Sequence, residues 1–301
     1  MKLNRSLSIL AAGLILAAPA SAAGRKNDVL LKAMKTELAR SAKKLRKAEK
    51  NKMYFLGYEA RDTRTANVTA ELGALSYTGE RHYRSIDVDV RIGSHKLDNT
   101  HQIKGRQGWY EWGGGGMTEL TGDDDEDALR AAIWLRTDKA YKDAQTRYTK
   151  VKTNKAVTAE EEDKSDDFSV ETPSRHYEKV SALKLDRSRW EDRIRGLSAE
   201  FKKHPFIIDS NVHFSVRTEN RYIVSTEGTE VVTGERYIRL SYNLSARTKD
   251  GMDLSRFNSY NGNRLSDLPD DETVRADMKR SARELKALSN APLVEPYTGP
   301  A

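Results

Sequence analysis

Histidines are the first residues to consider for chemistry, because zinc hydrolysis needs two or three ligands fixed on one element with a base beside them. His95 and His101 could meet across a loop, but exposed polar histidines are the simpler interpretation. No G-x-S-x-G nucleophile turn occurs either. The residues taken alone therefore predict no catalytic centre in this chain. The chain contains six histidines, none of them in an H-E-x-x-H pair: His82, His95, His101, His176, His204 and His213.

The string WYEWGGGG is the most unusual local feature of the sequence. Its glycines lack the following Lys-Ser/Thr that a phosphate-binding loop requires. Aromatic side chains beside a glycine hinge could form a mobile lid over a ligand, or they could simply dock on the domain. The residues of this candidate lid are Trp109, Tyr110, Trp112, Gly113, Gly114, Gly115 and Gly116.

Amphipathic patterns predict the helices that would position such residues. Apolar residues recur at helical spacing over Leu31–Leu45, which predicts a helix at about residues 28–50. The acidic run Asp123–Asp127 lacks the spacing of an EF-hand loop, and we interpret it as charge that complements the start of a helix. The other helices are expected at about residues 125–152, from a capping box at Ser188 and Glu191 to Pro205, and at about residues 270–289.

Short runs rich in β-formers predict antiparallel strands between these helices. Alternation is clearest from Ile86 to Ile92, where apolar even positions alternate with charged odd positions. The strings RDTRT (61–65), YTGER (77–81) and TEN (218–220) interrupt the apolar patterns. We interpret all three as turns between short strands.

The string TGER occurs twice, at Thr78–Arg81 and at Thr233–Arg236. A shift of 155 residues aligns the two copies, and it also aligns Gly73 with Gly228. We interpret each copy as a turn whose own glycine can adopt positive φ. The strands that follow are out of phase by one residue, so either a bulge intervenes or the identity is chance. Of the two, we favour an internal duplication.

These elements predict an α+β fold of two related units, each a helix with an antiparallel sheet, with a long helix and mobile loops between them. A signal peptide is expected at residues 1–22 and the first unit, with the long helix, at 23–154. An acidic linker or loop is expected at 155–174 and the second unit, with its closing helix, at 175–290. Residues 291–301 are expected to be a linker toward a missing C-terminal domain.

The N-terminal residues have the pattern of a secretory signal peptide. Lys2 and Arg5 precede the apolar run Leu7–Ala18, and small residues in an A-x-A pattern follow. We expect cleavage next to Ala22 and Ala23. The apolar run is about 12 residues, short of the ~20 that span a bilayer. We therefore expect a periplasmic or secreted protein that does not bind a membrane after cleavage.

Composition narrows the classes of function. The absence of cysteine excludes disulfides, thiolate zinc sites and catalytic thiols. The net charge of +7 is small beside 52 basic and 45 acidic residues, and basic stretches such as Lys43–Lys47 alternate with acidic ones. A nucleic-acid binder would instead gather Lys and Arg with aromatic residues on one face. We therefore expect no nucleic-acid partner.

Two strings carry a resemblance to a known family. They are LGALSYTGERHYRSIDVDVRIGSHKLDNT at Leu72–Thr100 and RYIVSTEGTEVVTGERYIRLSYNLSARTKDGMDLSRFNSY at Arg221–Tyr260. Together with LRAAIWLRTDKAYKDA at Leu129–Ala144, they resemble the N-terminal half of the TldD/PmbA family of zinc metallopeptidases, particularly its exported members. The resemblance implies an α+β domain with internal duplication, followed by a C-terminal domain whose helix carries an H-E-x-x-x-H-type zinc motif.

The resemblance leads to two hypotheses about function. The chain stops at NAPLVEPYTGPA, about where the family continues toward its metal helix, so no zinc ligand or catalytic residue is transferred to it. The leading hypothesis is a truncated N-terminal domain that shapes a cleft for peptide or unfolded polypeptide and is inactive alone. Zinc is then implied only for the full-length protein, and a homo- or heterodimer is implied by the family. The alternative is a stand-alone periplasmic binding or scaffold module without enzymatic activity.

Overall fold

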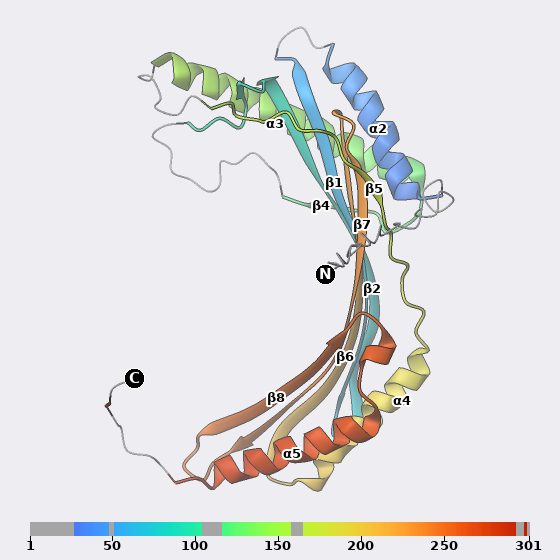
Figure 1. The fold of residues 1–301 in the computed structure, drawn as a ribbon, viewed down its shortest axis with the longest axis vertical. Coiled ribbons are helices and arrows are strands. Elements are labelled where there is room, and N and C mark those ends of the chain that lie inside the picture. Colours follow the sequence, from blue (N-terminus) through green and yellow to red (C-terminus); the bar gives the residue numbers. More distant parts are fainter. Residues whose placement is uncertain (1–26, 48–50, 104–115, 158–164, 293–297, 300–301) are drawn as a thin grey trace, which may run out of the picture.

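One mainly antiparallel sheet runs through the whole structure (Figure 1). The computed structural model describes residues 27–47, 51–103, 116–157, 165–292 and 298–299. Its long strands pair in the order β2-β1-β6-β7, so two hairpins are joined through β1 and β6. The predicted α+β class is confirmed. The long strands are β1 (Met53–Glu71), β2 (Ala74–Ser94), β6 (Ile207–Ser225) and β7 (Glu230–Arg247).

Short strands extend both edges of this sheet. On one side, β3 (Leu97–Asp98) and β4 (Thr118–Leu120) pair with β2. On the other side, β5 (Arg175–Tyr177) pairs in parallel with the start of β7, and β8 (Asp253–Gly262) pairs antiparallel with its end. Each edge is therefore covered along only part of its length.

The four α-helices that the structure describes pack on one face of the sheet, in two pairs. Figure 1 shows the sheet bent into an arc with α2, α4 and α5 on its outer side. The first pair covers the end of the sheet near the β6–β7 turn, and the second covers the opposite end. The pairs are α2 (Val29–Leu45) with α3 (Glu126–Val157), and α4 (Arg187–Ser198) with α5 (Asp271–Ser289); short 3-10 turns at Ala199–Lys203 and Leu265–Asp267 belong to the second pair.

Even-numbered strand positions supply the sheet side of two separate hydrophobic clusters. In the first cluster, Leu56 of β1 packs with Ile133 of α3, and both are fully buried. In the second, Val68 of β1 lies with Phe214 of β6, whose ring stacks on Trp190 at a centroid distance of 3.6 Å. Side chains two residues apart in a strand share a face, so β1 uses one face for both clusters.

A buried polar zone, which we call the waist, separates the two clusters on this same face. Arg84 donates from Nε to Asp62 Oδ2 at 2.8 Å, and His82 Nε2 lies 2.9 Å from Asp62 Oδ1. Asn220 exchanges two hydrogen bonds with the backbone of Val180, at 2.8 and 3.0 Å. The strands thus remain continuous where the sequence is polar, because these inward polar groups find partners.

Three predicted turns are wrong, and two of them lie at the waist. RDTRT (61–65) lies inside β1, TEN (218–220) lies inside β6, and YTGER (77–81) lies inside β2. The inward-pointing side chains of the first two strings belong to the waist. Their residue types are also common in turns, which explains the wrong prediction. The glycines with positive φ between the long strands are Gly73 (φ 78) and Gly228 (φ 101), not the glycines of TGER.

The predicted helices exist, but some of their ends differ. The first runs over Val29–Leu45 and the long one extends to Val157. The predicted capping box at Ser188 is wrong, because the N-cap is Asp186, whose carboxylate accepts from Arg189 N at 3.1 Å. Glu191 instead accepts from Thr78 Oγ1 at 2.9 Å, which ties α4 to the sheet.

The structure shows one plan used twice, a helix, a long hairpin and a second helix. Ala60 pairs with Ile86 in the first hairpin, and Phe214 pairs with Leu240 in the second. Phe214 lies 154 residues after Ala60, and Leu240 lies 154 residues after Ile86. The turn glycines of the two hairpins are instead 155 residues apart. A bulge between Thr69 and Ala70 accounts for the change from 155 to 154. The bulge precedes TGER, so the two TGER copies do not occupy equivalent positions.

Candidate functional site: the uncovered face of the sheet

The odd-numbered positions of the long strands point to the face without helices, which we call the uncovered face. No helix among the described residues packs on it, and it lies on the inner side of the arc in Figure 1. Strands of about 20 residues at ~3.3 Å per residue make this face ~60 Å long. It therefore offers an extended surface to a partner or substrate.

Charged residues form a network at the centre of the uncovered face. Arg221 of β6 donates to both oxygens of Glu59 of β1, at 2.9 and 2.8 Å. Arg61 lies 3.4 Å from Glu59 and 3.8 Å from Glu219, and Arg217 also pairs with Glu219. Burial works against the charge of Glu59, but the hydrogen bonds and charges of Arg221 and Arg61 outweigh it and lower the pKa of this carboxyl.

Small polar residues replace the charges between this network and the β1–β2 turn. Thr69 of β1 and His213 of β6 are cross-strand partners, and their Oγ1 and Nδ1 atoms lie 2.9 Å apart. Burial, together with the charge of nearby Arg239, lowers the pKa of His213. The other members of this polar carpet are Asn67, Asn211, Ser215, Ser241, Asn243, Ser259 and Asn261.

Exposed aromatic side chains border the polar carpet. Tyr77 of β2 is 57% exposed, Tyr237 of β7 is 39% exposed and Phe257 of β8 is 63% exposed. Tyr237 donates to Asn261 Oδ1 at 2.6 Å and accepts from Arg239, which also lies over its ring. Large apolar side chains with a polar carpet between them are a surface suited to contact with another molecule.

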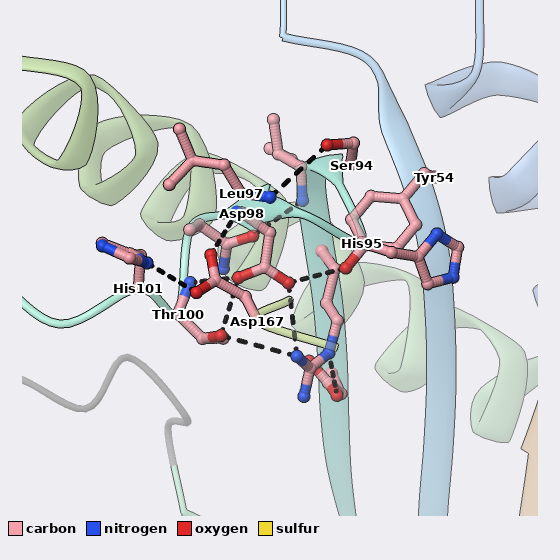
Figure 2. Close-up of polar contacts among 12 residues, drawn as sticks. Tyr54, Ser94, His95, Leu97, Asp98, Thr100, His101 and Asp167 are labelled. Atoms are coloured by element: carbon pink, nitrogen blue, oxygen red, sulfur yellow. Dashed lines mark hydrogen bonds and ion pairs between the residues drawn. The ribbon is translucent and has the colours of Figure 1, made fainter. Parts of the chain in front are cut away.

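A hydrogen-bonded cluster closes the other end of the uncovered face, and Figure 2 shows it centred on Asp98. The Asp98 carboxylate is fully buried and accepts from Tyr54 Oη at 2.6 Å and from Arg91 at 3.3 Å. It also accepts from the backbone N and Oγ1 of Thr100, both at 2.6 Å. Burial, with the hydrogen bond to Asp98, raises the pKa of Tyr54 above its usual value.

Phe168 fixes the neighbouring segment in this cluster. Its ring stacks on His95 at an angle of 12°, and the Arg91 guanidinium lies 3.9 Å from its centroid on the sheet. Its backbone N donates to His95 O at 3.0 Å. Asp167 accepts from Asp98 N at 2.8 Å and lies 2.5 Å from His101 Nδ1. The cluster is thus an anchor that holds residues 167–168 against β1, β2 and β3.

The polar groups of this face can offer charge and hydrogen bonds to a ligand. Among the described residues, no group of three or more His, Asp or Glu side chains is placed to hold a metal ion. The carboxylates at the centre of the face and at Asp98 are engaged by arginines, and burial raises the pKa of Asp89 despite its pairing with Arg91. Arginine-paired and buried carboxylates offer charge and hydrogen bonds rather than a free general base.

The structure brings two of the sequence candidates together. His95 and His101 both lie in the anchoring cluster, but His95 Nε2 meets Glu227 at 3.2 Å whereas His101 meets Asp167. His82 belongs to the waist and His213 to the polar carpet. The remaining two, His176 beside Glu178 and His204 near Phe206, lie apart from both surfaces.

Two predicted sites lie outside the described residues. Of the candidate lid, Trp109, Tyr110, Trp112 and Gly113 to Gly115 are not described, and Gly116 accepts a hydrogen bond from Arg136 of α3 at 3.2 Å. The signal cleavage residues Ala22 and Ala23 also lie outside the described residues. The lid and the cleavage site therefore stay predictions. No helix in the described ranges is both long and apolar enough to cross a membrane.

Solved structures with a similar fold are known. A candidate modulator of DNA gyrase from Bacteroides thetaiotaomicron matches 84% of this chain at 12% identity with a TM-score of 0.50. TldE from Thermococcus kodakarensis matches 84% at 13% identity and a TM-score of 0.47. A candidate modulator of a DNA gyrase from Thermotoga maritima matches 87% at 12% identity and a TM-score of 0.47. The fold is shared.

This likeness shows the architecture alone. The chain spans about half the length of each matched structure, with 50% of the Bacteroides protein covered. The sequence matches no protein-family model and no curated protein. The shared architecture agrees with the α+β fold that the resemblance implies.

Proposed function

We propose that this chain performs the role of the N-terminal half of an exported TldD/PmbA-like peptidase, in which the uncovered face borders a cleft for peptide or unfolded polypeptide. One observation carries the proposal: a sheet face ~60 Å long carries no helix of the described residues and displays hydrogen-bonding side chains with exposed aromatics. In this proposal the zinc centre belongs to the full-length assembly, and the chain alone binds without cleaving.

The physical support lies in how the face is built. Backbone groups of the central strands are engaged in the ladder, so a ligand lying across them meets side chains only. Short Asn, Ser and Thr side chains present donors and acceptors at low entropic cost. Such groups match the amides of an extended polypeptide without selecting particular side chains, which suits a broad substrate class.

Fluorescence anisotropy with a labelled unfolded polypeptide tests this proposal. Phe257→Ser removes a side chain that is 63% exposed on the face, and Leu135→Ser removes one equally exposed, at 63%, on α3. Burial of a large apolar side chain contributes about 1.5–3 kcal/mol, so Phe257→Ser should weaken binding about tenfold or more. Leu135→Ser should leave binding unchanged. Equal losses in both variants would contradict a cleft on this face.

Hydrolysis is tested separately. The purified chain is incubated with zinc and the same polypeptide, and products are followed by mass spectrometry with and without a chelator. We expect no cleavage, because no metal-binding group lies in the described residues. Chelator-sensitive cleavage would refute the assignment of catalysis to another part of the assembly.

A further inference from the structure

A groove opens between α2 and the β6–β7 turn, on the helix-covered side of the sheet. Its volume is 780 Å³, within the range of about 300–1,000 Å³ typical of ligand sites. One stripe of α2 forms one wall, residues 224–230 form the other, and Arg175 of β5 stands between them. The groove is distinct from the uncovered face, because its floor includes Ala42 and Val224 of the first hydrophobic cluster.

Cations line this groove in excess. Lys35 pairs with Glu230 at 2.8 Å, so that pair contributes no net charge. Lys43 of α2, Arg46 at the C-cap of α2 and Arg175 of β5 face no acidic partner among the described residues. Three positive charges from two separate elements therefore converge on one recess, which creates a local positive potential.

The rest of the lining adds apolar and hydrogen-bonding groups. Leu38, Ala42 and Val224 provide an apolar floor, while Ser225 and Thr229 of the turn carry hydroxyls. None of the lining residues is aromatic, so the groove has no platform on which a nucleic-acid base could stack. An anionic ligand with an apolar part fits this combination better than a nucleic acid.

We propose that this groove binds an acidic peptide segment, with carboxylates held by Arg46 and Arg175 and with apolar side chains on Leu38 and Ala39. Guanidinium groups form bidentate, charge-assisted hydrogen bonds with carboxylates, and this geometry favours arginine over lysine. The site serves a second polypeptide ligand, apart from any substrate on the uncovered face.

The end of α2 supplies a matched control. Lys43 and Lys44 both lie in its last turn, where cations complement the helix dipole. Only Lys43 lines the groove, whereas Lys44 and Lys47 do not. The dipole explains the general basicity of this end, but it does not explain why Arg175 of another element adds its charge to the same recess.

The test is anisotropy with a labelled, N-acetylated peptide of alternating Glu and Leu, and with its Gln-for-Glu counterpart. The double variant Arg46→Gln/Arg175→Gln should weaken binding of the acidic peptide about tenfold or more, since the charge-assisted hydrogen bonds to its carboxylates are lost. The control Lys44→Gln/Lys47→Gln loses the same charge outside the groove and should weaken binding less than about twofold. Circular dichroism confirms that both variants remain folded.

Three outcomes would overturn the proposal. They are an equal loss in the two double variants, equal affinity for the Gln peptide, and groove-dependent binding of single-stranded DNA or anionic vesicles as tight as that of the acidic peptide. Phe257→Ser should leave acidic-peptide binding unchanged, because it lies on the other face. Failure of this site and failure of the proposed cleft are therefore distinguishable.

Discussion

Removing Arg84 should destabilise the protein more than any other single change at the waist. The guanidinium donates to Asp62 at 2.8 Å, to Asp123 O at 2.9 Å and to Asp124 at 2.5 Å. The side chains of Arg84 and Asp62 are 4% and 7% exposed, whereas Asp124 is 63% exposed. In Arg84→Leu, the Asp62 carboxylate stays buried and keeps only His82 at 2.9 Å as a side-chain partner.

The magnitude follows from this geometry. Breaking a buried ion pair by removing one partner costs about 3–5 kcal/mol, because the other charge is left uncompensated. His82 remains within hydrogen-bond distance of Asp62, at 2.9 Å, so we expect the lower end, about 3 kcal/mol. At about 2–4 °C per kcal/mol for chains of 150–250 residues, this corresponds to a Tm lower by about 6–12 °C.

Urea denaturation followed by circular dichroism measures the free energy of unfolding, with Asp62→Leu/Arg84→Leu as the decisive comparison. Replacing both members of a buried pair by apolar groups is often close to neutral, so the double variant should recover most of the loss. Asp124→Ala removes an exposed partner and should cost about 1 kcal/mol or less. A loss below about 1 kcal/mol in Arg84→Leu, or additive losses in the double variant, would refute the reasoning.

Three further predictions concern the uncovered face and the turns. Arg221→Gln should raise the pKa of Glu59, measured by NMR titration of its carboxyl carbon; an unchanged pKa would contradict the pairing. Burial lowers the pKa of His213 in the native protein. Below about pH 6.5 the unfolded chain therefore binds a proton at this residue that the native protein does not bind. Stability should therefore fall as the pH drops below that value, and His213→Gln should flatten this dependence in chemical denaturation. Gly93→Ala should lower the Tm more than Gly251→Ala: both have positive φ, 116° and 94°, but only at Gly93 would a Cβ press on a backbone carbonyl.

Helices were predictable because their signals are local. The stripe of α5, Val274, Met278 and Leu285, recurs at helical spacing in the sequence and is fully buried in the structure. Asp270 caps that helix by accepting from Thr273 N at 2.8 Å. A periodic pattern of this length predicts a helix without tertiary information. The structure confirms that each predicted helix exists, and only the positions of some ends differ.

Strand lengths could not be predicted from local pattern. Asp62, Thr218 and Asn220 point inward at the waist, where each is buried. In sequence they look like turn formers, since Asp, Thr and Asn are common in loops. Their partners lie far along the chain: Asn220 bonds Val180, 40 residues away. Only tertiary contacts distinguish a polar strand interior from a turn.

The candidate site was predicted least well. The uncovered face consists of odd positions spread over β1, β2, β6, β7 and β8, and no short motif marks it. Alternation from Ile86 to Ile92 did place Asp87, Asp89 and Arg91 away from the core. What sequence could not supply is the order of strands, which sets Glu59 beside Arg221 across 162 residues.

The waist explains why neither the strand lengths nor the candidate site could be predicted from the sequence. Leu56 and Val68 lie in different hydrophobic clusters on one continuous strand, so the polar residues between them hold two cores in one sheet without a chain break. A turn at RDTRT would instead produce two short sheets with separate faces. Because β1 passes unbroken through the waist, the uncovered face is also unbroken, and a polypeptide lying along it could contact both halves at once. A strand break at the waist should therefore impair binding on the uncovered face even where both cores survive.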